Sequence, residues 1–219
     1  MIKKRERIFL IILNGFSFLV FTLLFIASLN NSIPSSFDYS LYQNVGLWQR
    51  PFLNNIMVSI SSFFHPGVLL FLTILFFPLF LIKKDSLHGI IFLLSTFFGI
   101  VSALILKEII SSVRPIGIIP ETSFGFPSAH ATVAATFFIS ALLTLRDYIK
   151  NNAIENIITA LGIIVLILVG LSRVYLQVHW FTDFLAGFTL GLFWVTFFII
   201  IYYFDFKDFK TKNDKTSSR

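Results

Sequence analysis

Residues 172–183 read SRVYLQVHWFTD, and they separate two long apolar runs at residues 154–171 and 184–204. Each run is about as long as a helix that crosses the hydrocarbon core of a bilayer. The whole chain is 56% hydrophobic and only 13% charged, with a mean hydropathy of +0.86, whereas soluble domains carry about a quarter charged residues. The sequence therefore predicts an all-α integral membrane protein in which this short polar stretch joins two spans.

The joining stretch carries Arg173, His179 and Asp183. If a helix begins near Trp180, His179 and Asp183 lie four residues apart on one face and can touch. A carboxylate behind an imidazole fixes its tautomer, stabilises its cationic form and leaves the other ring nitrogen free to react. The alternative is a helix-end pair without a chemical role, because paired titratable groups mark function only statistically.

The apolar segments predict six transmembrane helices, with approximate bounds 8–29, 63–82, 87–110, 127–145, 154–171 and 183–204. The first is longer than the core of a signal peptide, so we expect a retained span. Residues 8–204 form one six-span domain in this reading, between a basic N-terminus at 1–7 and a basic tail at 205–219 that we expect to be disordered. Within the polar loop 30–55, apolar residues at helical spacing favour a short amphipathic helix on the membrane surface, namely Phe37, Leu41, Val45 and Trp48.

The basic residues are distributed unevenly between the two sides of this topology. Thirteen of the 17 Lys and Arg residues lie on the side of the N-terminus, in segments 1–7, 83–86, 146–153 and 205–219. By the positive-inside rule, both termini are then cytoplasmic. Basic residues that cluster beside spans do not form the stripe typical of nucleic-acid binding, so nucleic acid is not an expected partner. The remaining four are Arg50, Lys107, Arg114 and Arg173, and the last three lie at span ends on the extracytoplasmic side, with His179 and Asp183.

Lys107 and Arg114 lie near the end of the third span, and Pro115 follows. Their separation of seven residues makes two helical turns, so both side chains project from one face if the helix persists to Arg114. Charges at span ends are costly and mark a functional site by default. For Lys107 the alternative is a side chain that snorkels to the interface.

The sequence Phe-Pro-Ser-Ala-His at residues 126–130 opens the fourth span. Proline is favoured in the first turn of a helix, and the free backbone N–H groups of that turn face any anion in front of them. Ser128 adds a hydroxyl donor, and His130 lies just inside the helix. Taken alone, such a histidine is most simply an interfacial residue.

Together these segments bring three cations, a helix N-terminus and two imidazoles to one face of the membrane. Cations and a helix N-terminus are typical of a phosphate site, and two histidines can supply a nucleophile and a proton donor. The sequence has no cluster of carboxylates to hold Mg²⁺, and the absence of Cys excludes thiolate chemistry and Cys-ligated metals. The pattern therefore predicts phosphoryl transfer through a phosphohistidine, without a metal or another cofactor.

Three motifs in this order resemble the signature of the type 2 phosphatidic acid phosphatase (PAP2) superfamily. They are Lys-x6-Arg-Pro at 107–115, Pro-Ser-Ala-His at 127–130 and Ser-Arg-x5-His-x3-Asp at 172–183. The second motif departs from the usual Pro-Ser-Gly-His, because Ala129 replaces glycine. Alanine fits a helical position and still presents its N–H, whereas a position that needs positive φ would weaken phosphate binding; we expect the helical case.

The resemblance implies a PAP2/haloperoxidase-like helical bundle and a role for each motif residue. His179 would attack phosphorus with Asp183 orienting it, and His130 would protonate the leaving oxygen. The phosphoryl oxygens would be held by Lys107, Arg114, Ser128, the Ala129 N–H and Arg173.

The implied activity is that of a membrane lipid phosphatase. The implied substrates are phosphatidic acid, phosphatidylglycerol phosphate or undecaprenyl diphosphate, and the small size of the chain favours the last two. The competing hypothesis is a non-enzymatic or lipid-transporting membrane protein on the same scaffold, although such a protein has no need of both histidines and Asp183.

Overall fold

The computed structural model describes residues 4–82, 86–146 and 148–202. Over these residues the chain is helical, without a strand, and the fold class predicted from composition is confirmed. Several predicted features lie wholly or partly outside the described residues: the tail at 205–219, residues 83–85 of the basic turn 83–86, residues 1–3 of the N-terminus 1–7, and the last two residues of the sixth span 183–204. The helices are α1 (Lys4–Leu29), α2 (Ser36–Trp48), α3 (Pro51–Phe63), α4 (Pro66–Ile82), α5 (Ser86–Ile110), α6 (Ala129–Arg146), α7 (Asn152–Tyr175) and α8 (Phe181–Ile201).

Five of the helices in the described residues are long and apolar enough to cross a membrane, namely α1, α5, α6, α7 and α8. Helices α3 and α4 meet at an angle of 42° across a short break, and taken together they make a sixth candidate span. The predicted second span at 63–82 contains α4, which begins at Pro66, but α4 reaches the length of a span only together with α3. The expectation of a mostly polar loop at 30–55 was wrong in part, because α3 begins at Pro51 inside it. Proline at this first helical position has its φ already set for a helix.

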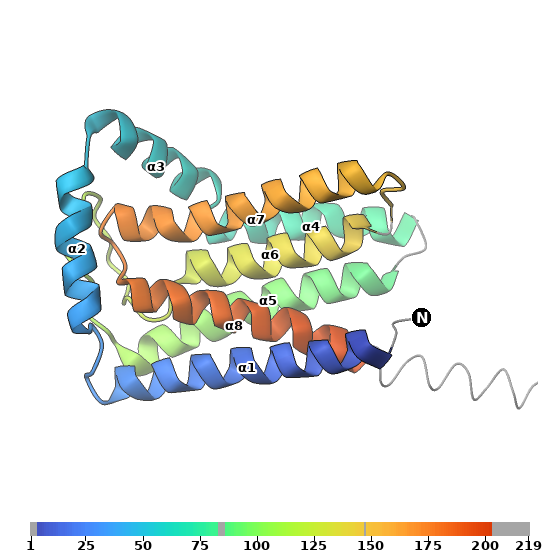
Figure 1. Cartoon of the computed structure of the whole chain (residues 1–219), viewed down its shortest axis with the longest axis horizontal. Coiled ribbons are helices and arrows are strands. Elements are labelled where there is room, and N and C mark those ends of the chain that lie inside the picture. Colours follow the sequence, from blue (N-terminus) through green and yellow to red (C-terminus); the bar gives the residue numbers. More distant parts are fainter. Residues whose placement is uncertain (1–3, 83–85, 147, 203–219) are drawn as a thin grey trace, which may run out of the picture.

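Helix α2 confirms the predicted short helix between the first two spans. Ser35 caps it, since its hydroxyl accepts from the Asp38 N–H at 3.3 Å while the Asp38 carboxylate accepts from the Ser35 N–H at 2.8 Å. This reciprocal pair is the capping box that fixes a helix start. In Figure 1, α2 lies across one end of the bundle, and the start of α1 and the turn between α6 and α7 lie at the opposite end.

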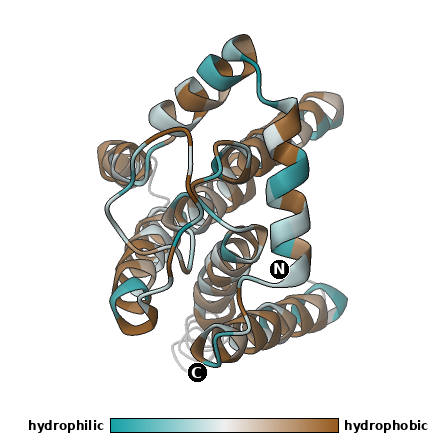
Figure 2. Ribbon diagram, turned by 90° about the vertical axis from the view of Figure 1, so that its left-hand side faces the viewer, coloured by the Kyte–Doolittle hydropathy of each residue, from teal (hydrophilic) through white to brown (hydrophobic). Residues whose placement is uncertain are grey.

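The end of the bundle beside α2 is tied together by hydrogen bonds between distant segments. The Thr182 N–H donates to Asp38 Oδ1 at 3.0 Å, and Gln177 Nε2 donates to the Tyr42 carbonyl at 2.8 Å. The Tyr42 hydroxyl donates to the Ile116 carbonyl at 3.0 Å. Figure 2 views this end of the bundle and shows α2 and the loops here as more hydrophilic than the long helices behind them. These bonds hold the connecting loops in one place.

Helices α6 and α8 approach closely at the centre of the bundle. A side chain at Gly187 or Gly191 of α8 would collide with the α6 backbone, at the Ser128 and Thr132 carbonyls respectively. Glycine at these two positions therefore permits a backbone contact that any larger residue would prevent. The same contact is extended at its end by the Ser128 N–H, which donates to the Asp183 carbonyl at 3.0 Å.

A buried apolar cluster lies where α6 meets α4 and α7, and it consists of Leu69, Val133, Ala134, Ala135, Leu166 and Val169. Helix α1 packs along α8 (Figure 1) and is fixed there by Asn14, whose Nδ2 donates to Thr196 Oγ1 at 2.8 Å. Many large apolar side chains remain exposed on the outer surfaces of the helices, such as Phe9 and Phe16. An apolar exterior of this kind is expected where lipid replaces water as the solvent.

Candidate active site

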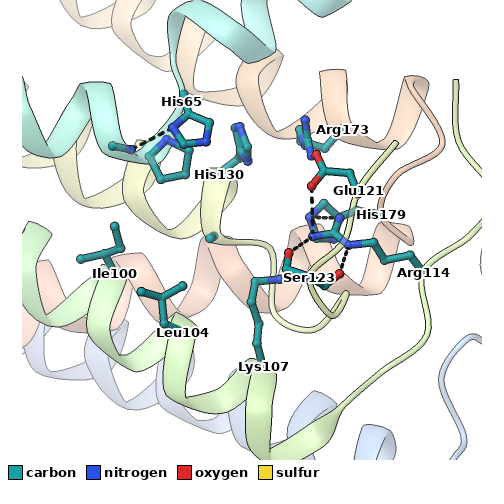
Figure 3. Close-up of a pocket in the computed structure, with 13 residues that line it drawn as sticks. His65, Ile100, Leu104, Lys107, Arg114, Glu121, Ser123, His130, Arg173 and His179 are labelled. Carbon is teal, nitrogen blue, oxygen red and sulfur yellow. Dashed lines mark hydrogen bonds and ion pairs between the residues drawn. The ribbon is translucent and has the colours of Figure 1, made fainter. Parts of the chain in front are cut away.

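A cavity of about 270 Å³ lies where the ends of several helices meet, and no single segment supplies its wall. Figure 3 shows these side chains converging from α5, the loop 111–128, α6, the α7–α8 junction and the break between α3 and α4. The lining residues are His65, Pro66, Gly67, Ile100, Leu104, Lys107, Arg114, Glu121, Ser123, Ala129, His130, Arg173 and His179. Six of the eight predicted site residues are among them.

His179 and Asp183 are in contact, as their spacing predicts. Helix α8 begins one residue after Trp180, so Asp183 lies in its first turn and His179 just before it. Asp183 Oδ2 lies 3.2 Å from His179 Nδ1 and accepts the Trp180 N–H at 3.1 Å. Both side chains are almost fully buried. The second carboxylate oxygen, Oδ1, has no hydrogen-bond partner among the described residues.

The neighbours of His179 determine which of its ring nitrogens is free to react. Arg114 Nη1 lies 2.9 Å from His179 Nε2, and a guanidinium can only donate. The lone pair is therefore on Nε2, and the ring proton is on Nδ1, toward Asp183. Burial, helped by the nearby cations Arg114 and Lys107, holds the pKa of His179 well below its ordinary value of 6.5. The ring is thus neutral at pH 7, and Nε2 becomes available as a nucleophile when the Arg114 N–H donates to a substrate oxygen instead.

Arg114 reaches this position from the loop and not from a helix. Helix α5 ends at Ile110, and Ser111 has a φ of 52° in the left-handed region, so the helix does not persist to Arg114. The condition for a helical face shared by Lys107 and Arg114 is therefore not met. The Arg114 guanidinium is fixed by three acceptors, the Ser123 carbonyl at 2.6 Å, the Ser123 hydroxyl at 2.9 Å and the Val178 carbonyl at 2.6 Å.

Lys107 and Arg173 complete a group of three cations around the cavity. Lys107 is buried near the end of α5, and its Nζ donates to the carbonyls of Phe124 at 2.5 Å and Gly125 at 3.0 Å. Arg173 is buried in the last turn of α7 and donates from Nη1 to the Ser61 hydroxyl at 2.6 Å. Each cation thus comes from a different segment, and each is held by neighbouring oxygen atoms.

Glu121 is a site residue that the sequence reasoning missed. Its Oε1 forms an ion pair with Arg173 Nη2, and its Oε2 lies 3.8 Å from Arg114 Nη2. Figure 3 shows the carboxylate between the two guanidinium groups. An anion therefore already occupies the place where two cations converge. The signal in the sequence was a lone acidic residue in the Pro- and Gly-containing loop between the first two motifs.

Helix α6 begins at Ala129, slightly later than the predicted start of the fourth span at residue 127. Pro127 precedes the helix and Ser128 is buried as its N-terminal boundary, with its carbonyl accepting from the Thr132 N–H at 3.0 Å. Ser128 is not among the residues that line the cavity, so its predicted contact with phosphate stays a prediction. Ala129 is helical, in agreement with the expectation for this departure from the usual motif, and it lies on the cavity wall.

His130 lies in the first turn of α6 and is 7% exposed. Its Nε2 is buried and has no hydrogen-bond partner among the described residues. Its ring packs edge-on against His65, with ring centroids 5.3 Å apart and an interplanar angle of 87°. His65 comes from the break between α3 and α4 and is a second residue that the sequence reasoning missed. The cavity therefore holds a nucleophilic nitrogen on His179 and a buried, unpaired nitrogen on His130.

Within the described part of the chain, no group of three or more His, Asp or Glu residues is placed to hold a metal ion. The donors around the cavity are instead guanidinium, ammonium and backbone N–H groups, which suit an anion. The cations exceed the single carboxylate of Glu121, so the cavity favours a ligand of negative charge.

The chain is similar to known proteins in both sequence and fold. The sequence profile of the PAP2 superfamily matches residues 12–207. The chain is 31% identical over 194 residues to phosphatidylglycerophosphatase B of Bacillus subtilis (strain 168), and the match covers 84% of this chain and 91% of that protein. It is 30% identical over 169 residues to an undecaprenyl-diphosphatase of Sulfolobus acidocaldarius, with 74% of this chain and 76% of that protein covered.

The fold is also similar to a solved structure, described as the first transmembrane PAP2 type phosphatidylglycerolphosphate phosphatase from Bacillus subtilis. The TM-score is 0.74 at 30% sequence identity, and the match covers 91% of this chain and 96% of that one. The region matched by the family profile includes all three motifs and every residue that lines the cavity. The chain therefore belongs to the PAP2 superfamily.

Proposed function

We propose that this protein is a membrane lipid phosphatase that transfers a phosphoryl group first to His179 and then to water. The observation that carries the proposal is the state of His179 at the wall of a cavity lined by cations, where Asp183 holds Nδ1 and Nε2 accepts from Arg114, one of those cations. A buried carboxylate in this position supports the positive charge that develops on the ring during attack. The non-enzymatic alternative gives no reason for this arrangement.

In the first step, His179 Nε2 attacks phosphorus and the bond to the leaving oxygen breaks. Lys107, Arg114 and Arg173 compensate the charge on the phosphoryl oxygens, and this phosphoryl group takes the place that the Glu121 carboxylate occupies between the two arginines. His130, in its imidazolium form, donates the Nε2 proton to the leaving oxygen and is left as a neutral imidazole.

In the second step, water attacks the phosphorus of the phosphohistidine and the bond between phosphorus and nitrogen breaks. His130, which has given up its proton, accepts one from the attacking water. The products are inorganic phosphate and neutral His179, and the site returns to its starting state. Every proton transfer uses groups of this chain and water, so no metal is required.

The substrate is a lipid that carries a terminal phosphoryl group. The relatives are named as a phosphatidylglycerophosphatase and an undecaprenyl-diphosphatase, which supports phosphatidylglycerol phosphate or an isoprenyl diphosphate as the substrate here. Ile100 and Leu104 of α5 give one side of the cavity an apolar wall, which suits the beginning of a lipid chain.

We place both termini in the cytoplasm and the cavity at the extracytoplasmic face. The support is the distribution of basic residues together with the position of α2 and the cavity at the end of the bundle away from the start of α1. Cysteine introduced at the exposed Gln43 in α2 should react with an impermeant thiol reagent in intact cells, and cysteine at the exposed Asn152 should react only after lysis. The reverse pattern would overturn this orientation.

The activity is tested on protein purified in detergent, by measuring phosphate release from phosphatidylglycerol phosphate, phosphatidic acid and an isoprenyl diphosphate. We expect release that survives EDTA and is inhibited competitively by vanadate, which mimics five-coordinate phosphorus. His179→Ala serves as the inactive control. If the wild-type protein releases no phosphate from any of these lipids but moves lipid between the leaflets of a vesicle, the transport alternative holds instead.

A further inference from the structure

His65 lies outside the three motifs, yet its side chain faces the same cavity as His130. It occupies the break between α3 and α4, and its carbonyl accepts the Leu69 N–H at 3.0 Å, so it stands at the N-terminal boundary of α4. Pro66 and Gly67, the first residues of that helix, also line the cavity. The 42° angle between α3 and α4 is what turns this boundary toward the site.

The hydrogen bond to Gly67 determines what His65 can offer. The Gly67 N–H donates to His65 Nδ1 at 3.1 Å, so Nδ1 holds the lone pair and the proton of the neutral ring is on Nε2. Figure 3 shows this bond and the ring next to His130. His65 is also an exposed residue that lines the cavity, and its Nε2–H is the donor that the ring can offer there.

The position of His65 places that donor beside the leaving group. In the proposed mechanism, the leaving oxygen contacts His130 Nε2, which is buried and has no partner among the described residues. The centroids of the two rings are 5.3 Å apart. In Figure 3, His65 lies on the side of His130 away from Arg173, Glu121 and His179, which surround the transferred phosphoryl group in that mechanism. The atoms bonded to the leaving oxygen therefore extend toward His65.

We infer that His65 binds the leaving group and selects substrates whose leaving group is itself a phosphate. A lipid diphosphate leaves as a lipid monophosphate, whose oxygens accept from the His65 Nε2–H. A phosphomonoester leaves as an alcohol, which brings no anion to this place. The inference rests on the proposed phosphatase function and narrows its substrate class to lipid diphosphates.

The test compares two substrates with the same chain, an isoprenyl diphosphate and the matching isoprenyl monophosphate. His65→Phe keeps an aromatic ring against His130 but removes the donor. It should lower the ratio of kcat/KM for the diphosphate over the monophosphate by about 10–100-fold, which is the rate equivalent of one hydrogen bond to a charged group. His65→Gln, whose amide N–H replaces Nε2–H, should recover most of the ratio. Ser62→Ala, in the last turn of α3 and outside the cavity wall, is the matched control and should leave the ratio unchanged.

Two results would overturn the inference. If His65→Phe lowers both values of kcat/KM equally, His65 only supports the His130 ring. If His65→Phe changes neither value of kcat/KM, His65 does not touch the leaving group. Failure of the proposed function looks different, because the wild-type protein would then release phosphate from neither substrate. Melting in detergent shows that each variant is folded.

Discussion

Replacement of Asp183 by asparagine removes one charge from the site with almost no change in shape. Asp183 Oδ2 accepts from both His179 Nδ1 and the Trp180 N–H. Because the Trp180 N–H needs an acceptor at that place, the amide oxygen of the substituted side chain should occupy it, and the amide nitrogen should take the place of Oδ1. The ring of His179 then keeps its tautomer, and the only property lost is the negative charge.

The size of the effect follows from the distance between the two side chains. As phosphorus is attacked, His179 becomes positive at 3.2 Å from the carboxylate. Two unit charges at this separation interact by roughly 5 kcal/mol at an effective dielectric constant of about 20. At about 1.4 kcal/mol per factor of ten in rate, we expect kcat to fall by about 10³–10⁴-fold. KM should change little, because Asp183 is not among the residues that line the cavity.

The assay is a rapid-quench measurement of phosphohistidine formation with radiolabelled substrate, since the charge matters in that step. The matched control is Asp38→Asn. Asp38 is equally buried and accepts from Thr182, next to Asp183, so it belongs to the frame of the site and not to the His179 pair. This variant should lower the melting temperature and leave the rate of phosphoenzyme formation close to that of the wild type. An Asp183→Asn protein that forms the phosphoenzyme within about tenfold of the wild-type rate would refute the role given to the carboxylate.

Three further outcomes are expected. His179→Ala should form no phosphoenzyme on any substrate. His130→Ala should reduce the rate about 10²–10⁴-fold on a lipid monoester and less on p-nitrophenyl phosphate, whose leaving group needs little protonation. Loss of the phosphoenzyme only in His130→Ala would reverse the assignment of the two histidines. Glu121→Gln should lower the inhibition constant of vanadate, because the carboxylate competes for Arg114 and Arg173; weaker inhibition would argue against that competition. After correction for substrate ionisation, the acid limb of the pH profile of kcat/KM should lie below pH 6.5. The reason is that the lowered pKa of His179 keeps the ring neutral as the pH falls through 6.5. An acid limb at or above pH 6.5 would contradict a lowered pKa of His179.

The motifs in the sequence were sufficient to predict six of the residues that line the cavity, because most of these six lie at helix ends whose positions the hydropathy pattern reveals. His179 and Asp183 could be paired from their spacing alone, since that spacing acts through a local helix start. Arg114 shows where such reasoning stops. Its place depends on how residues 111–128 fold back over the cavity, and that path is set by contacts with distant segments such as the Val178 carbonyl.

The residues that were missed share a different property. Glu121 lies in an irregular loop and His65 at a break between helices, so neither belongs to a periodic pattern. The break itself could have been found, because Pro51 and Pro66 are both good first residues of a helix. The direction in which the break turns could not, since it depends on packing of α4 against α5 and α6. Only the fold brings His65 to within ring contact of His130.

The close contact between α6 and α8 has a practical consequence. The backbones at Ser128 and Thr132 meet the glycines of α8 directly, and the Ser128 N–H bonds to the Asp183 carbonyl. The frame that carries the two histidines is therefore held by backbone atoms and does not need either imidazole. A His179→Ala protein should keep its pocket and, unable to turn over, should retain its natural lipid through extraction from the membrane. Mass spectrometry of that trapped lipid would name the physiological substrate directly.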